Sequence, residues 1–116
     1  ECKKSNILIV CSGWKGRFCI EDLLLAGLIS ESLLLTNSFE SYSDSVVLAK
    51  KMYGLAKYDI FDFLSESSYR NRMKLDKDVK YCLQQDIIST VPVWCSSTTN
   101  KLAGSGFFSI KNDLMS

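Results

Sequence analysis

The sequence predicts an α/β domain, because one short and wholly apolar segment is followed by a glycine-bearing turn and then by a series of helical patterns. The apolar segment is Ile7–Cys11, which is rich in β-branched residues and shows no polar alternation. That pattern is typical of a strand covered on both faces, as in a parallel or mixed sheet flanked by helices. The chain has 116 residues, which is enough for one compact domain.

The first helix is expected to begin near Cys19 or Ile20 and to run to about Leu33. Glu21 and Asp22 lie in its first turn, where the helix dipole favours negative charge. The apolar residues of this segment cover a wide face, which indicates packing on more than one side.

The remaining elements follow from capping residues and apolar spacing. After a serine-rich loop we predict, in chain order, a helix capped by Ser43 or Asp44 and ending near Lys57, a short helix over Asp59–Leu64 capped by Asp59, a break over Ser65–Ser68, a basic stretch over Tyr69–Leu75, and a helix opening at Asp76 or Lys77. Pro92 confines the extended segment Thr90–Cys95 to an edge strand or a strand start. We assign residues 1–95 to the domain and residues 96–116 to a weakly structured tail.

Composition and charge exclude several classes of protein. The chain is 47% hydrophobic and 23% charged, as in an ordinary globular domain and unlike a disordered one. Its net charge of +1 gives no reason to expect a nucleic-acid partner or a membrane surface. The longest apolar run, Leu23 to Ile29, is far shorter than the ~20 residues of a membrane-spanning helix.

The cysteine and histidine content narrows the chemistry further. The chain has 5 cysteines, none in a C-x-x-C pair, and 0 histidines. A Cys/His zinc site and a nucleophile activated by histidine are therefore excluded within this chain. We expect reduced thiols that act mostly as small buried hydrophobes, as in a cytoplasmic protein.

The turn between the predicted strand and the first helix is the densest cluster of polar chemistry in the sequence. Gly13 and Gly16 permit unusual backbone angles, and Lys15 and Arg17 add two cations. Together with N–H groups at a helix start, these residues could bind a phosphate. The G-x-x-G spacing matches neither the P-loop nor the dinucleotide fingerprint. A plain connecting turn therefore stands as the alternative to an anion site.

The carboxylates near the helix starts also have two readings. Glu21 and Asp22 either offset the helix dipole or include a Mg²⁺ ligand, since Mg²⁺ takes oxygen ligands and keeps several waters. Asp44 is either a helix cap or, as the weaker alternative, a metal ligand.

Other reactive residues have a structural and a functional reading as well. Cys19 lies at a helix start, a position that lowers a thiol pKa, so it is a candidate nucleophile. A capping or packing role is favoured, because the chain has no histidine to activate the thiol. The basic residues Arg70, Arg72 and Lys74 are expected to form a solvated helix face; the alternative is that they face an anionic substrate. Trp14 is expected to be a packing residue.

The segment Val10–Asp22, followed by Ala26-Gly27-Leu28-Ile29, resembles the 2-phosphosulfolactate phosphatase family. That family shows a strand, then Ala-Gly-Thr-x-Gly-x-Phe-Ser-x-Glu/Asp-Asp, then Ala/Ser-Gly-x-Ile a few residues on. Later blocks agree in order and approximate spacing; they are Asp44-Ser45 before Val47, Ala49 and Tyr53, then Asp78–Cys82, Asp86–Ile88 and Val91-Pro92. The resemblance covers roughly Asn6 to Trp94.

The resemblance implies a three-layer α/β/α fold with a mixed sheet, represented here by its helix-rich C-terminal half. It also implies Mg²⁺-dependent hydrolysis of 2-phospho-3-sulfolactate to 3-sulfolactate and phosphate, a step towards coenzyme M. The residues that fall in the family pattern are Gly13, Gly16, Phe18, Glu21, Asp22 and Asp44. On this basis Glu21 and Asp22 are the catalytic candidates and alternative metal ligands, with Asp44 weaker. The substrate-binding candidates are Gly13, Lys15, Gly16, Arg17 and Cys19.

Several features depart from the family pattern. Trp14 stands where the family has threonine and Cys19 where it has serine, and no histidine precedes the Asp78 block. The Arg-Ala-Thr-like and Thr-Asn-Gly-like elements of the family's N-terminal half are absent from the chain.

We therefore expect a C-terminal part that is inactive alone, whose partners are a small anionic phosphorylated substrate and the missing N-terminal half. The sequence is also compatible with a homo-oligomer. The alternatives are a non-catalytic remnant or binding module of the same fold, and a different phosphate-ligand enzyme such as a sugar-phosphate binder.

Overall fold

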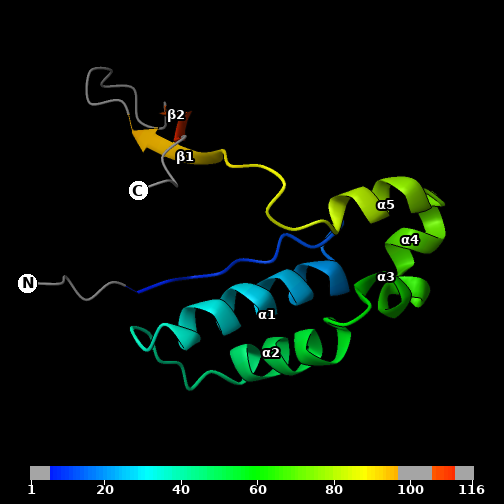
Figure 1. The fold of residues 1–116 in the computed structure, drawn as a ribbon, viewed down its shortest axis with the longest axis horizontal. Helices are drawn as coiled ribbons and strands as arrows, with labels where there is room; N and C mark the ends of the chain where they lie inside the picture. The colour runs from blue at the N-terminus through cyan, green and yellow to red at the C-terminus, as the bar shows by residue number, and fades with distance from the viewer. Residues whose placement is uncertain (1–5, 97–105, 112–116) are drawn as a thin grey trace, which may run out of the picture. The chain divides into compact units, whose positions relative to one another are not determined.

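The computed structural model describes residues 6–96 and 106–111, which form helices first and a hairpin of strands last (Figure 1). The elements are α1 (Ile20–Leu35), α2 (Asp44–Ala56), α3 (Ile60–Phe63), the 3-10 turn η1 (Leu64–Glu66), α4 (Ser68–Met73), α5 (Asp76–Cys82), β1 (Val91–Ser96) and β2 (Gly106–Lys111). The chain divides into two compact units between Leu83 and Gln84.

The first unit is built on the pair α1 and α2, which lie side by side along their length (Figure 1). Gly27 on α1 makes this close approach feasible. A Cβ atom added there would lie 2.7 Å from Tyr53 Cβ and 2.8 Å from the Ala49 carbonyl carbon, shorter than any packed contact allows. Ala49 and Tyr53 on α2 are correspondingly buried. The two helix backbones are therefore held close at a single glycine.

The core of this unit lies at one end of the helix pair. Leu24, Ala56 and Leu64 form its buried centre, with exposures of 4%, 1% and 3%. The half-buried side chains packed around them are Ile20, Met52, Ile60, Phe63 and Leu83. This cluster joins α1 and α2 to the short helices that follow, so it fixes the start of α1 relative to them.

The short helices depend on side-chain caps and on one arginine. The Asp59 carboxylate accepts from the Asp62 N–H at 2.8 Å, and the Ser67 hydroxyl accepts from the Arg70 N–H at 3.2 Å. The Arg70 guanidinium lies 3.7 Å from the centroid of the Phe61 ring and pairs with Asp76 at 3.1 Å. It also donates to the Phe61 carbonyl. Arg70 therefore ties α3, α4 and α5 together.

Most of the helices predicted from sequence are confirmed. The first runs Ile20–Leu35 and the second Asp44–Ala56, with Ser43 at the N-cap position. The Asp59 cap and the helix opening at Asp76 are also present. Among the helices of the described ranges, none combines the length and the apolar character needed to cross a membrane.

The prediction of a strand over Ile7–Cys11 is wrong for the described structure. These residues are assigned to no strand, and Leu8 and Val10 are 85% and 76% exposed. A strand needs a neighbouring strand for its N–H and C=O groups. The strands within residues 6–96 and 106–111 are β1 and β2, and these pair with each other.

The second unit contains an antiparallel pair of strands. Val91 of β1 lies opposite Lys111 of β2, and Ser96 lies opposite Gly106. The extended segment around Pro92 is thus confirmed as an edge strand, since each strand of a two-stranded sheet is an edge. β2 lies inside the segment 96–116 that we predicted to be weakly structured; residues 97–105 and 112–116 lie outside the described residues. The domain boundary at residue 95 stays a prediction.

Candidate functional site

The turn before α1 is a tight hairpin that is closed by its own backbone. The Trp14 N–H donates to the Arg17 carbonyl, and the Arg17 N–H donates to the Trp14 carbonyl, each at 3.0 Å. Between them Lys15 and Gly16 have φ of 51° and 71°, as a type I′ turn requires at both central positions. Gly13, at φ 64°, also needs to be glycine, because an added Cβ would collide with the Arg17 carbonyl.

These bonds revise how the turn can hold an anion. The N–H groups of Trp14 and Arg17 are used inside the turn, and that of Gly13 is used by Asp22. Within the described part of the chain, no acceptor is found for the N–H groups of Lys15 and Gly16. The groups that the turn can offer to an anion are therefore the N–H groups of Lys15 and Gly16 and the side chains of Lys15 and Arg17, while the N–H of Gly13 is not available.

Asp22 anchors the turn to the first turn of α1. Its Oδ2 atom accepts from the Gly13 N–H at 2.7 Å and from the Ser12 hydroxyl at 3.4 Å. A hydrogen bond from a backbone N–H to a carboxylate contributes about 1.5–3 kcal/mol. Asp22 thus has a structural role in this chain, in the position where the helix dipole also favours its charge.

Glu21 is in a different situation from its neighbour. Its Oε1 atom is buried and finds no hydrogen-bond partner among the described residues. A buried carboxylate oxygen without a partner is costly unless a cation or a water satisfies it. Of the two alternative metal ligands, Glu21 therefore fits Mg²⁺ better. No group of three His, Cys, Asp or Glu side chains gathers within the described ranges, so waters or other segments would supply further ligands.

Asp44 is not brought to this site. It opens α2, whose first turns lie beside the last turn of α1, where Leu34, Val46 and Val47 line a common hollow. Leu34 is about 18 Å along the helix from Asp22, at about 1.5 Å per residue. The structure thus gives Asp44 a place in a first helical turn, away from Glu21.

The Cys19 thiol has a perturbed pKa, in the direction opposite to the one expected for a helix start. Partial burial raises the pKa of Cys19 above its ordinary value, and the negative charges of Asp22 and Glu21 raise it further, while Arg72 opposes them. The prediction that the helix start lowers this pKa is therefore wrong, because burial of the thiol and then the two carboxylates favour its neutral form. A thiol that stays protonated is a poor nucleophile.

This gives a prediction for the pH dependence of alkylation. A raised pKa keeps the thiolate fraction small as pH rises through the ordinary range of a thiol, so Cys19 should react with iodoacetamide at a higher midpoint pH in the folded chain than in urea. Measurement by mass spectrometry of the Cys19 peptide, in EDTA, checks this. Asp22→Asn should lower the midpoint and Arg72→Ala should raise it. An equal midpoint in folded and unfolded chains would contradict the expectation.

Trp14 joins the turn to the basic residues of α4. Its ring is half exposed, at 49%, and the Arg72 guanidinium carbon lies 5.4 Å from the ring centroid. The Lys15 ammonium lies 5.8 Å from the same centroid. Both distances are within the range of cation–π attraction. The Trp14 ring thus makes cation–π contacts with Lys15 and Arg72, which the expectation of a packing residue did not include. The sequence signal for these contacts was the basic run Arg70, Arg72 and Lys74.

Comparison with known proteins decides the family. The family model for 2-phosphosulpholactate phosphatase matches residues 1–97. The chain belongs to the 2-phosphosulpholactate phosphatase family. The resemblance stated from the turn and the first helix is thereby confirmed.

Several curated members of this family match the chain at moderate identity. A protein of Cyanothece sp. (strain PCC 7425 / ATCC 29141) named "Probable 2-phosphosulfolactate phosphatase" is 33% identical over 95 residues, covering 76% of this chain and 39% of the relative. Proteins with the same name from Clostridium botulinum (strain Alaska E43 / Type E3) and Thermotoga petrophila are 30% and 32% identical, covering 42% and 39% of those relatives. The chain thus spans about two fifths of their length. No solved structure matches the chain.

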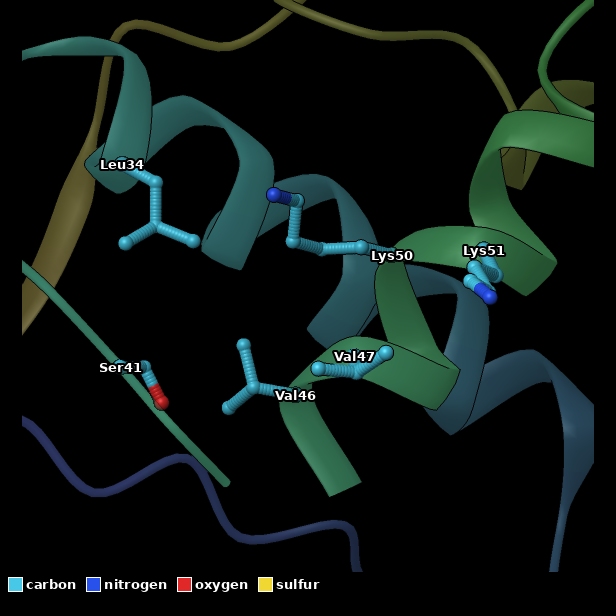
Figure 2. A pocket seen from close by; sticks show the side chains of 6 residues that line it. All are labelled: Leu34, Ser41, Val46, Val47, Lys50 and Lys51. Carbon is cyan, nitrogen blue, oxygen red and sulfur yellow. The ribbon is translucent and has the colours of Figure 1, made fainter. Parts of the chain in front are cut away.

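The hollow lined by Leu34, Val46 and Val47 lies at the other end of the helix pair from this family motif. Figure 2 shows Leu34, Ser41 and Val46 around it, with Lys50 reaching across towards α1. Its lining is mainly apolar and contains none of the predicted site residues. The candidate site of this family member is therefore the turn and the start of α1.

Proposed function

We propose that the chain is the C-terminal part of a phosphatase that hydrolyses 2-phospho-3-sulfolactate to 3-sulfolactate and phosphate. Family membership supports this reaction class. The observation that carries the proposal is the unpartnered, buried Oε1 of Glu21, directly after a cationic turn that Asp22 holds in place. This arrangement puts a carboxylate able to bind a metal next to groups able to bind a phosphate.

Magnesium is the metal that the proposal assigns to Glu21. When bound, Mg²⁺ supplies positive charge that offsets the charge on the phosphoryl oxygens. Glu21 would hold it through Oε1, and Asp22 is the alternative ligand through the carboxylate oxygen that does not bond Gly13. Mg²⁺ keeps several waters in its shell, so one or two protein carboxylates suffice.

The turn supplies the groups that bind and orient the phosphate. The side chains of Lys15 and Arg17 face the double charge of a phosphomonoester, and the N–H groups of Lys15 and Gly16 provide directed donors. In the reaction a water adds to phosphorus, the ester P–O bond breaks, and the proton lost by the water ends on the released alcohol. Cys19 would contact the phosphate as a neutral thiol, at the position where the family pattern has a serine hydroxyl.

The missing N-terminal half is the partner that the proposal requires. The exposed apolar residues Ile7, Leu8 and Val10 are suited to a strand that finds its neighbours in that half, within a three-layer α/β/α fold. A place in coenzyme M formation and a cytoplasmic location belong to the same proposal. We expect the 116-residue chain to be inactive without this partner.

The proposal is tested by phosphate release from 2-phospho-3-sulfolactate, measured for the full-length gene product and for the 116-residue chain. The expected result is turnover by the full-length protein in MgCl₂, loss of turnover in EDTA with recovery on adding Mg²⁺, and none by the chain alone. Absence of turnover by the full-length protein in both conditions would overturn the proposal. Turnover that EDTA does not change would remove the metal from it.

A non-catalytic remnant of the same fold is the second candidate. Three observations favour it: Trp14 replaces a threonine of the family pattern, Cys19 stands in place of a serine and carries a raised pKa, and the chain has no histidine. A full-length protein that is folded by circular dichroism but releases no phosphate would support this alternative.

A further inference from the structure

Arg72 is the arginine of α4 whose N–H donors have no partner within the described structure. Its neighbour Arg70 is fully used, by Asp76, by the Phe61 carbonyl and by the Phe61 ring. Arg72, by contrast, makes no hydrogen bond or ion pair with any residue in the ranges 6–96 and 106–111. Its guanidinium is therefore available to an anion, since a planar guanidinium carries five N–H donors.

Aromatic rings hold this guanidinium in place. Arg72 lies over the Trp14 ring at 5.4 Å and over the Tyr69 ring at 5.7 Å, measured from its central carbon to the ring centroids. Both rings are half exposed, at 49% and 41%. Contacts of this kind stabilise a cation without using its N–H donors. A pre-positioned guanidinium loses less freedom when an oxyanion binds.

The rings also bring Arg72 to the turn of the candidate site. Trp14 is the first residue of the closed turn, and Lys15 lies over the same ring at 5.8 Å. Arg17 closes the turn from the other side through its pair of backbone bonds with Trp14. Two cations from distant parts of the sequence, Lys15 and Arg72, therefore lie over one ring, and Arg17 belongs to the same turn. This concentration of positive charge favours a ligand with more than one negative group.

We propose that Arg72, positioned by Trp14, binds an oxyanion of the substrate beside the turn and so selects substrates that carry an anionic group in addition to the phosphate. This inference rests on the proposed function for the identity of the substrate. The same guanidinium chemistry suits a sulfonate and a phosphoryl group, and the experiment below separates them. Trp14 is a positioning residue in this proposal.

The test compares kinetic constants of the full-length gene product for 2-phospho-3-sulfolactate. Arg72→Ala is expected to raise KM by roughly 10-fold or more, with kcat within about 3-fold, because a charge-assisted bond to the bound substrate is lost. Arg72→Lys should recover part of the loss. Lys77→Ala, which removes a cation from exposed α5, is the matched control and should leave KM unchanged. A KM for Arg72→Ala equal to that of the control would overturn the inference.

Two further comparisons identify which anionic group Arg72 binds and test whether the Trp14 ring positions it. With 2-phospholactate, which keeps the phosphate and the carboxylate but lacks the sulfonate, Arg72→Ala should leave KM unchanged if Arg72 binds the sulfonate. A raised KM with this substrate, together with a fluorescence response to inorganic phosphate, would assign Arg72 to the phosphoryl group and overturn the selectivity. Trp14→Ala should raise KM as Arg72→Ala does, Trp14→Phe should not, and the double variant should match Arg72→Ala alone. Effects that multiply in the double variant would overturn the positioning role.

A binding measurement on the 116-residue chain separates failure of this inference from failure of the proposed function. In a Trp94→Phe background, tryptophan fluorescence reports Trp14 alone, because the chain has 2 tryptophans. Inorganic phosphate and 3-sulfolactate are the titrants, and at least one should change the emission, with the change lost in Arg72→Ala and kept in Lys77→Ala. No change with either titrant overturns the inference. Binding without turnover by the full-length protein would leave the anion site standing and reject the phosphatase.

Discussion

Gly27→Ala is expected to destabilise the helical unit by about 3 kcal/mol, because overpacking a close-packed contact costs about 1–3 kcal/mol or more. The added methyl group would meet the Ala49 backbone and Tyr53 Cβ, the latter at 2.7 Å. Neither can move aside by a change of rotamer. Alanine is intrinsically the better helix former by about 1 kcal/mol, so a net loss would isolate the packing effect. Urea unfolding followed by circular dichroism at 222 nm measures it.

Gly54→Ala is the matched control for this substitution. Gly54 also lies in a helix, but a Cβ there meets nothing within 4 Å. Only the propensity gain remains, so this variant should be more stable than the parent chain by up to about 1 kcal/mol. If Gly27→Ala behaved in the same way as Gly54→Ala, the two helices would not pack as closely as the structure has them.

Glu21→Gln is expected to lower Mg²⁺-dependent phosphate release by the full-length protein on the order of 100-fold, as losses of single charge-stabilising groups do. The variant keeps the shape of the side chain but removes the charge that holds the metal. A higher Mg²⁺ concentration at half-maximal rate should accompany the loss. Steady-state phosphate release across a MgCl₂ titration measures both quantities. An unchanged rate and an unchanged Mg²⁺ requirement would remove Glu21 from the site.

Asp22 variants serve as the comparison, because they separate charge from anchoring. Asp22→Asn keeps an oxygen that accepts from the Gly13 N–H, whereas Asp22→Ala removes the bond that is 2.7 Å long in this structure. Amide exchange at Gly13 should therefore accelerate in Asp22→Ala and change little in Asp22→Asn.

The free energy of unfolding should be unchanged or slightly raised in Glu21→Gln, because this variant replaces an unpartnered buried carboxylate oxygen by a neutral amide.

The features that depend on nearby residues could be predicted from the sequence. The α1 and α2 helices follow from apolar spacing, and the cap of α3 follows from Asp59, whose carboxylate accepts from the Asp62 N–H. These signals act within about one helical turn, so the rest of the fold does not alter them. The family motif around Gly13 and Asp22 is local in the same sense.

The features that depend on distant residues could not be predicted. Arg72 meets Trp14 only because the short helices fold back onto the start of α1, and no periodic pattern encodes that contact. The strand expected over Ile7–Cys11 needs neighbours that the sequence pattern cannot supply by itself. Glu21 and Asp22 were equal alternatives in the sequence, but successive helix residues point about 100° apart. One bonds Gly13 while the other has a buried oxygen without a partner.

The closed turn of Trp14 to Arg17 has a further consequence for ligand affinity. Fixing the backbone of a flexible residue costs about 1–2 kcal/mol in conformational entropy. Here the reciprocal bonds of the turn, each 3.0 Å long, and the Asp22 anchor are made by groups of the chain itself. That ordering cost is met when the chain folds, so the free energy of contact with an anion can appear as affinity instead of being spent on closing a loop.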